Sequence, residues 1–229
     1  MPHSEVILRD ELGYRWLIRG SSEFLGVKQD GIGYDIRHEI GTLKYLSEIA
    51  CKACTFVDVG AQVGYYSVRL AKHYEKVIAI EPDNFNLEGL KRNLELNSIQ
   101  NVYVVPKAIT NRVGKEIFYC CGGGSKLGMY VHGNNKPLGI QDVETDLLDN
   151  VVEKAMAIKV DTEGYEAHVL EGAKRLIAER PIWIIEDHRE IYHETLRPDY
   201  WSRILFLLQD YKAVRLEATN WVFKPYLKV

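Results

Sequence analysis

Residues 55–67 read TFVDVGAQVGYYS and predict a buried strand, a tight glycine turn and the start of a helix. The strand part is apolar apart from Asp58, which fits a parallel strand that is covered on both faces. Gly60 and Gly64 bracket the turn, and the lack of a side chain there lets a ligand approach the backbone. A helix that starts after the turn presents free N–H groups and the positive end of its dipole. This stretch therefore predicts a site for a charged small molecule.

The chain after this stretch continues as an alternation of helices and strands. Apolar spacing predicts helices at residues 65–74 and 85–96, and apolar runs predict strands at residues 76–81 and 101–105. Strands that alternate with helices are joined by right-handed crossovers and form a parallel sheet. This part of the chain therefore predicts a doubly wound α/β fold.

The second half of the chain predicts two more parallel strands and a final hairpin. Strands are predicted at residues 155–161 and 181–186, and helices at residues 165–179 and 200–209. Two late strands, at residues 211–216 and 220–223, are joined by a connection that is too short for a crossover. We therefore expect a Rossmann-like, mostly parallel sheet with helices on both faces, finished by an antiparallel edge strand.

The N-terminal part predicts an arm and a leading helix. Residues 14–19 alternate weakly between polar and apolar side chains and predict a hairpin arm. Gly31 and Gly33 predict a turn, and apolar spacing over residues 35–50 predicts a helix that leads into the first buried strand.

One insert interrupts the alternation of strands and helices. Residues 115–119 predict a strand, and the glycine-rich insert at about residues 120–140 is either a lid over a site or a plain linker. We expect one domain overall, in which residues 1–50 form the arm and leading helix and residues 51–229 form the α/β part that carries the insert.

The composition limits the class of protein. The chain has 229 residues, with 29 Lys and Arg against 32 Asp and Glu, and a formal net charge of −3. A broad nucleic-acid surface needs a clustered basic excess, so only a local basic patch stays open. No apolar run approaches the roughly 20 residues of a membrane span, and the N-terminus lacks the layout of a signal peptide. We therefore expect a soluble, cytoplasmic protein.

The chain has four cysteines, which are too few for a disulfide framework in a sequence of this length. Cys51 and Cys54 have C-x-x-C spacing, and Cys120 and Cys121 are adjacent. Four thiolates can hold zinc, but a second pair without a spacer has poor ligand geometry. Cys54 enters the first buried strand, where we expect it to pack as a small hydrophobic residue.

The glycine turn does not match two common phosphate-binding motifs. A dinucleotide fingerprint that starts at Gly60 needs glycines where the chain has Gln62 and Tyr65. A P-loop needs Lys and Ser or Thr directly after Gly64, and the chain has two tyrosines there. Both a dinucleotide and a nucleoside triphosphate are therefore poor candidates.

Two carboxylates instead favour S-adenosylmethionine. Asp58, just before the turn, repels a pyrophosphate but suits an ammonium group. Glu81 ends the next strand, where an acid can accept hydrogen bonds from a ribose diol. A nucleoside that carries an amino acid satisfies both conditions, with its carboxylate at the turn and its adenine near Lys107, Ala108 and Ile109.

Five blocks of the chain resemble the FkbM-type methyltransferases, a branch of the class I S-adenosylmethionine-dependent enzymes. These blocks are FVDVGAQVGYYS at 56–67, IEP at 80–82, LKRN at 90–93, IKVDTEGYE at 158–166 and WVF at 221–223. They occur in consistent order over about residues 35–226, and the block at 158–166 is the most specific. Gln62 departs from the family, which more often has Asn there. The resemblance implies a seven-stranded sheet whose last strand is antiparallel.

The pattern and the resemblance together predict the residues that bind S-adenosylmethionine. They are Asp58, Gly60, Gln62, Gly64, Tyr65, Glu81, Pro82, Lys107, Ala108, Asp161 and Glu163.

The methyl acceptor is expected between the first and fourth strands, where the strand order reverses. The polar residues at those strand ends are Asp161, Glu163, Glu186, Asp187 and His188. A hydroxyl acceptor must lose its proton, and by residue type His188 is the first candidate base and Asp161 the second. In the alternative interpretation, Asp161 and Glu163 cap a helix and His188 is a surface histidine. A weaker alternative is Mg²⁺ bound by Asp161, Glu186 and Asp187.

The acceptor class stays open. We expect O-methylation of a small molecule or glycan, with an amine or RNA as the alternative. The Asn/Asp-Pro-Pro-Tyr signature of N-methyltransferases is absent after the fourth strand, but basic residues near the insert leave RNA possible: Lys107, Arg112, Lys115, Lys126 and Lys136. Other classes are an NAD-dependent oxidoreductase, which the failed fingerprint disfavours, and a cofactor-binding module without catalysis.

Overall fold

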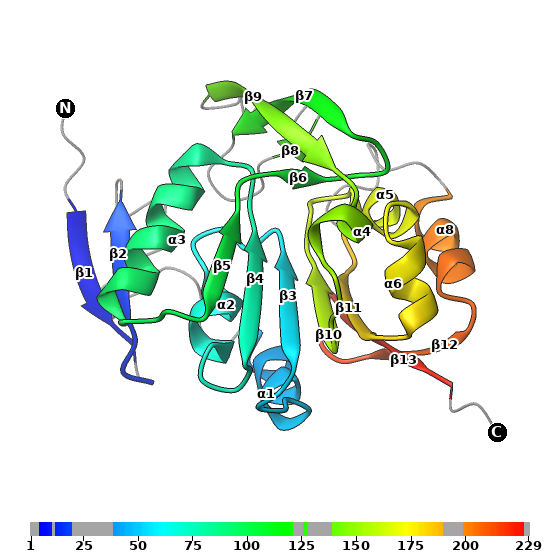
Figure 1. The fold of residues 1–229 in the computed structure, drawn as a ribbon, viewed down its shortest axis with the longest axis horizontal. Coiled ribbons are helices and arrows are strands. Elements are labelled where there is room, and N and C mark those ends of the chain that lie inside the picture. Colours follow the sequence, from blue (N-terminus) through cyan, green and yellow to red (C-terminus); the bar gives the residue numbers. More distant parts are fainter. Residues whose placement is uncertain are drawn as a thin grey trace.

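The computed structural model describes residues 5–10, 12–19, 39–120, 126–127, 139–189 and 199–226. Its centre is a seven-stranded sheet with the order β12-β13-β11-β10-β3-β4-β5 (Figure 1). The strands are β3 (Thr55–Val59), β4 (Lys76–Ile80), β5 (Val102–Val105), β10 (Ala157–Val160), β11 (Ile182–Glu186), β12 (Tyr211–Arg215) and β13 (Asn220–Pro225). The predicted sheet and the reversal of strand order between β3 and β10 are confirmed.

The last strand is antiparallel, but it does not lie at the edge of the sheet. β13 runs antiparallel to both β11 and β12, so the edge strand β12 is parallel to the rest. The expected antiparallel edge strand is therefore wrong in its position. The reason is burial: Val222 and Phe223 of β13 are buried, whereas most of β12 is exposed or half-buried. The more apolar strand of the hairpin takes the inner place.

Helices cover both faces of the sheet. They are α1 (Ile40–Glu48), α2 (Tyr65–Leu70), α3 (Asn84–Leu96), α4 (Leu148–Val151), α5 (Glu166–Glu171), α6 (Lys174–Glu179) and α8 (Tyr200–Leu207). Val57 and Val59 pack in one cluster with apolar residues of α4, α5, α6 and α8. Phe56, which points to the other face because side chains alternate along a strand, packs with α1 and α2. This arrangement confirms the predicted layers.

The predicted helix at residues 165–179 is interrupted between α5 and α6. A Cβ atom on Gly172 would lie 2.3 Å from the carbonyl oxygen of Thr110, so a neighbouring segment passes too close for any side chain. Asp149 accepts hydrogen bonds from the backbone N–H groups of Arg175 and Leu176, which start the second helix. A contact between distant segments therefore breaks a helix that is continuous by its apolar spacing.

A second, four-stranded sheet lies at the end of the main sheet to which β3 and β4 point (Figure 1). Its strands are β6 (Ala108–Ile109), β7 (Gly114–Cys120), β8 (Lys126–Leu127) and β9 (Gly139–Asp146). The strand predicted at 115–119 is confirmed by β7, and β9 was not predicted. Most of the glycine-rich insert lies outside the described residues, so its lid and linker interpretations stay predictions.

The N-terminal hairpin is confirmed as β1 (Glu5–Arg9) and β2 (Arg15–Arg19). It packs on the helices, because Trp16 is 5% exposed and Asp10 forms a buried ion pair with Arg69 at 2.8 Å. The predicted turn at Gly31 and Gly33 lies outside the described residues, as does the beginning of the helix predicted at 35–50.

Cys54 packs against the apolar cluster of α1, α2 and β3 as expected, but it also forms a disulfide with Cys51, which the sequence pattern did not predict. Cysteine side chains three residues apart in a turn meet at bonding distance, which a count of cysteines does not reveal. Among the described helices, none has the length and apolar character needed to cross a membrane.

Candidate active site

The glycine turn after β3 is in direct contact with the end of β10. Gly60 and Gly64 have φ values of 86° and 94°, which favour glycine. A Cβ atom on Gly60 would lie 1.8 Å from the carbonyl oxygen of Asp161, and one on Gly64 would lie 2.6 Å from Leu90 Cδ1. Gly60 therefore lets the turn approach the predicted acceptor strand closely, and Gly64 lets it approach α3.

Several backbone N–H groups of the turn are used inside the protein. Gly60 and Ala61 donate to the carbonyl of Ile80 at 2.9 and 3.0 Å, at the end of β4. Gln62, with a φ of 49°, donates its backbone N–H to Glu81 Oε2 at 2.8 Å. These bonds hold the turn against the neighbouring strand. The sequence pattern instead predicts that N–H groups of this stretch bind a ligand.

Asp58 holds the start of α2. It is 2% exposed and accepts hydrogen bonds from the backbone N–H and the hydroxyl of Ser67 at 3.1 and 2.6 Å. Burial raises the pKa of Asp58 to about 6, although the bonds from Ser67 oppose this shift. Tyr65, the first residue of α2, lies beside the Arg69 guanidinium, whose carbon is 4.2 Å from the ring centre.

Glu81 is the carboxylate at the end of β4, as predicted. It is 4% exposed and accepts bonds from the backbone N–H groups of Gln62 and Asp83 and from the Asn86 amide. Burial raises its pKa to about 7 despite these donors. A carboxylate has about four acceptor positions, so Glu81 retains capacity for a hydroxyl donor. It fits the predicted role of a ribose ligand.

The remaining predicted cofactor residues join the ends of β4 and β5 to the second sheet. The carbonyl of Pro82 accepts a hydrogen bond from the Gln141 side chain at 3.2 Å. Lys107 forms an ion pair with Asp146 at 2.7 Å, and Ala108 is buried in β6. The second sheet is thereby attached to the loop that follows Glu81.

A buried lysine joins the two predicted acceptor-side carboxylates. Lys159 is fully buried in β10, and its Nζ lies 3.2 Å from Asp161 Oδ2 and 3.3 Å from Glu186 Oε2. Burial raises the pKa of Asp161 well above its ordinary range, whereas Lys159 overcomes burial and lowers the pKa of Glu186 to about 2. Of the two carboxyl groups, Asp161 therefore takes up a proton more readily, and it is also the more exposed side chain.

His188 is buried among carboxylates, so the interpretation as a surface histidine is wrong. Its Nδ1 lies 3.0 Å from Glu166, and its Nε2 lies 3.5 Å from Asp161 and 3.6 Å from Glu163. Burial alone would lower its pKa, but these carboxylates raise the pKa to about 10. The imidazole is therefore a cation at neutral pH, and it must first lose that proton before it can serve as a base.

Glu166 organises the loop between β10 and α5, and the sequence interpretation missed it. It is fully buried and accepts bonds from the backbone N–H groups of Thr162 and Gly164 and from the Tyr200 hydroxyl. Against the effect of burial, His188 and these donors lower its pKa to about 2. The signal was present, because Glu166 ends the most specific block of the family pattern.

A metal ion bound here would compete with a lysine for the same carboxylates. Ligand atoms of Asp161, Glu186 and His188 lie within 4.8 Å of one another in the described part of the chain. However, the Lys159 ammonium already contacts both carboxylates, and the His188 imidazole is protonated. Asp187, the third ligand suggested by the sequence, instead pairs with a neighbouring arginine at 2.6 Å. These residues fit an ammonium group better than a divalent ion.

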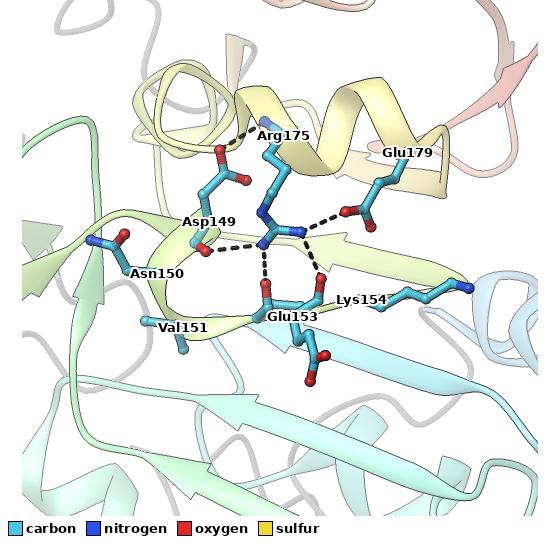
Figure 2. Close-up of a pocket in the computed structure, with 8 residues that line it drawn as sticks. Asp149, Asn150, Val151, Glu153, Lys154, Arg175 and Glu179 are labelled. Carbon is cyan, nitrogen blue, oxygen red and sulfur yellow. Dashed lines mark hydrogen bonds and ion pairs between the residues drawn. The ribbon is translucent and has the colours of Figure 1, made fainter.

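A surface pocket of about 860 Å³ lies between α4, the segment that follows it, and α6, and it contains none of these residues. Figure 2 shows that the Arg175 guanidinium occupies its centre, bound by the carbonyls of Asp149 and Glu153 and by the Glu179 carboxylate. The donors of Arg175 are therefore used to join α6 to α4 and to the segment after it. We therefore place the active site at the carboxyl ends of β3, β4, β10 and β11.

Solved structures of other proteins share this fold. An rRNA methylase from Streptococcus thermophilus is similar in structure, with 15% identity, a TM-score of 0.51 and coverage of 82% of this chain and 96% of that one. M. jannaschii TYW2 in complex with AdoMet has 17% identity, a TM-score of 0.50 and coverage of 98% and 88%. The M. jannaschii tRNA m1G37 methyltransferase has 13% identity and a TM-score of 0.53. The match covers 100% of this chain and 59% of that one. Identities this low show a shared fold only.

The family is established by sequence. No curated protein matches the chain. The model of the methyltransferase FkbM domain matches residues 58–215, which run from Asp58 at the glycine turn to the end of β12. Because this match covers most of the chain and includes the turn, Glu81 and the Lys159–Glu166 loop, the chain belongs to the FkbM family of methyltransferases.

Proposed function

We propose that the protein transfers a methyl group from S-adenosylmethionine to a hydroxyl of a small molecule or glycan. The observation that carries this proposal is the contact between Gly60 and Asp161. It brings the predicted donor turn against a carboxyl pair that can take up a proton. A donor at the turn and an acceptor at Asp161 would therefore be neighbours.

Glu81 supports the donor assignment. Its carboxylate lies at the end of the strand beside the turn and has one acceptor position left for a ribose hydroxyl. The group of carboxylates around Asp161 suits a ligand that carries a positive sulfonium, because opposite charges attract strongly where water is scarce. When bound, S-adenosylmethionine supplies an activated methyl group, so alignment of the acceptor provides much of the catalysis.

The acceptor hydroxyl loses its proton to the chain. The pKa of Asp161 is raised and that of Glu186 is about 2, so Asp161 is the stronger base of the two carboxylates. As a carboxylate, Asp161 would accept the proton of the acceptor hydroxyl. Lys159 contacts both carboxyl groups, and His188 contacts Asp161. Asp161 is thus our first candidate base, ahead of His188.

An RNA acceptor is the second candidate. Charge alone does not separate it from a hydroxyl compound, because Lys159, His188 and Arg189 pair with the carboxylates at this end of the sheet. The Asn/Asp-Pro-Pro-Tyr signature of N-methyltransferases is absent after β10, which favours a hydroxyl over a base amino group.

Calorimetry tests the donor site. The wild type should bind S-adenosylhomocysteine, and Glu81→Ala should weaken that binding about tenfold or more, because bonds to a charged acceptor contribute roughly 1.5–3 kcal/mol. Glu95→Ala is the matched control, since Glu95 pairs with Arg92 on an exposed part of α3 and should leave the affinity unchanged. Equal binding in all three proteins would contradict the donor site.

A labelled-methyl screen tests the acceptor class. Incubation of the protein with labelled S-adenosylmethionine and polyols, phenols, sugars or RNA should label a hydroxyl compound. Label that appears only in RNA would favour the second candidate.

A further inference from the structure

The Cys51–Cys54 disulfide lies at the opposite end of the main sheet from the active site. It closes the turn between α1 and β3, directly before Thr55. Figure 1 shows α1 near the end of the sheet from which β3 starts. The strand between this turn and Gly60 has five residues, which at about 3.3 Å per residue span roughly 16 Å. Neither the donor site nor the acceptor site uses this pair.

The turn keeps its shape without the disulfide. The backbone N–H of Cys54 donates to the carbonyl of Cys51 at 3.1 Å, and the carbonyl of Cys54 accepts from Glu75 and Lys76 at 3.1 and 3.5 Å. A disulfide stabilises a fold mainly by restricting the unfolded chain, and a closed loop this short restricts it least. A structural role therefore explains little of this bond.

The two sulfur atoms have different surroundings. Cys51 is an exposed residue, whereas Cys54 is half-buried and packs against the apolar cluster of α1, α2 and β3. An external thiolate therefore reaches the sulfur of Cys51 first, and Cys54 is the leaving thiol.

Basic residues lie close to the turn that carries Cys51. Lys52 follows Cys51 directly, and its Nζ donates to the carbonyl of Lys72. Together with burial, the charges of Lys72 and Lys52 lower the pKa of His73, which places several positive charges at this end of the molecule. Positive charge stabilises a thiolate and makes a cysteine reactive at neutral pH.

We propose that Cys51 and Cys54 form a thiol–disulfide exchange site that reacts reversibly with small thiols. A thiolate attacks Cys51 Sγ, the Cys51–Cys54 bond breaks, and the electron pair goes to Cys54 Sγ, which takes a proton. A second thiolate attacks the small molecule's sulfur in the mixed disulfide, and Cys51 leaves as a thiolate and is protonated. Two small thiols thus become one disulfide, and the protein gains two electrons and two protons.

The full chain tests this exchange in a Cys120→Ser, Cys121→Ser background that keeps only the proposed pair. The folded protein is equilibrated with mixtures of reduced and oxidised glutathione, trapped with a maleimide and weighed intact. We expect two labels in reduced buffer, none in oxidised buffer, and the same curve from both directions. Labelling that requires denaturant, or a reduced pair that does not re-form the disulfide, would overturn the proposal.

Single-cysteine variants test the asymmetry. Cys51, kept in Cys54→Ser, should react with iodoacetamide about tenfold faster at pH 7 than Cys54, kept in Cys51→Ser, because its thiolate is more accessible and more stable.

Lys52→Glu should slow the reaction of Cys51, whereas Lys44→Glu, on the exposed side of α1, should not. Equal rates at both cysteines, or no effect of Lys52→Glu, would contradict it. Circular dichroism confirms that each variant is folded, and binding of S-adenosylhomocysteine is measured separately because the exchange does not depend on it.

Discussion

The imidazole of His188 is held as a cation because three carboxylates lie within 3.6 Å of its nitrogen atoms. By residue type alone, a histidine at a strand end is a candidate base. Its three carboxylate neighbours come from the β10–α5 loop and the first residue of α5, 22 to 27 positions earlier in the sequence. No pattern along the chain reports that His188 folds back onto them. The protonation state is therefore a property of the packed site, and it moves the proposed base from His188 to Asp161.

The paired charges of His188 and Glu166 predict a pH-dependent stability. The pKa of His188 is raised from 6.5 to about 10, so its contribution is complete below pH 6.5 and is lost as pH rises through 10. The pKa of Glu166 is lowered from 4.5 to about 2, so its contribution is complete above pH 4.5 and is lost as pH falls through 2. The pair therefore stabilises the fold most between about pH 4.5 and 6.5.

His188→Gln should reduce the free energy of unfolding by about 3 kcal/mol at pH 5.5, since it leaves a buried carboxylate without its cation. The loss should shrink as the pH approaches 10, and urea unfolding at pH 5.5, 7.5 and 10 measures it. His73→Gln is the control, because the pKa of His73 is lowered rather than raised. A loss that is constant with pH would mean that His188 acts only by filling space.

At the level of secondary structure, the break between α5 and α6 depends on one glycine. Gly172→Ala places a Cβ atom 2.3 Å from the carbonyl oxygen of Thr110, and backbone on both sides prevents an easy shift. We expect a loss of about 2 kcal/mol or more in the free energy of unfolding, measured by urea unfolding. Gly114→Ala is the matched control, because its nearest neighbour would be 3.9 Å away, and it should change stability by less than about 1 kcal/mol. Equal losses in both variants would contradict this account of the break.

Elements whose pattern is local were predictable, and those that depend on distant contacts were not. The apolar runs of β3, β4, β10 and β11 identify buried strands because every residue of such a strand meets a helix on one face or the other. Three features depend on a neighbouring segment that is distant in the sequence. They are the interruption at Gly172, the inner position of β13 and the strand β9. Glu81 was placed correctly because it ends a strand, whereas the roles of Lys159 and Glu166 required the neighbours that only the fold supplies.

At the scale of the whole molecule, the proposed donor-binding and proton-transfer residues lie side by side at the carboxyl ends of the main sheet's strands. The end of β4 carries Glu81, and the ends of β10 and β11 carry Asp161 and Glu186, with β3 and its glycine turn between them. Because Gly60 touches Asp161, the two sides are adjacent without sharing side chains. Donor binding and proton transfer should therefore respond to different substitutions.

Asp161→Asn should lower kcat about 100-fold or more for a hydroxyl acceptor, because loss of a general base typically costs a factor of 10² to 10⁴. The amide keeps the size of the side chain, so the affinity for S-adenosylhomocysteine should stay within about threefold of the wild type. Glu81→Gln should show the reverse, with weakened donor binding and a kcat that recovers at saturating donor. Steady-state kinetics and calorimetry on the two variants distinguish these outcomes. If Asp161→Asn instead weakened donor binding and left kcat intact, Asp161 would be a donor ligand, and the base would have to be sought at His188.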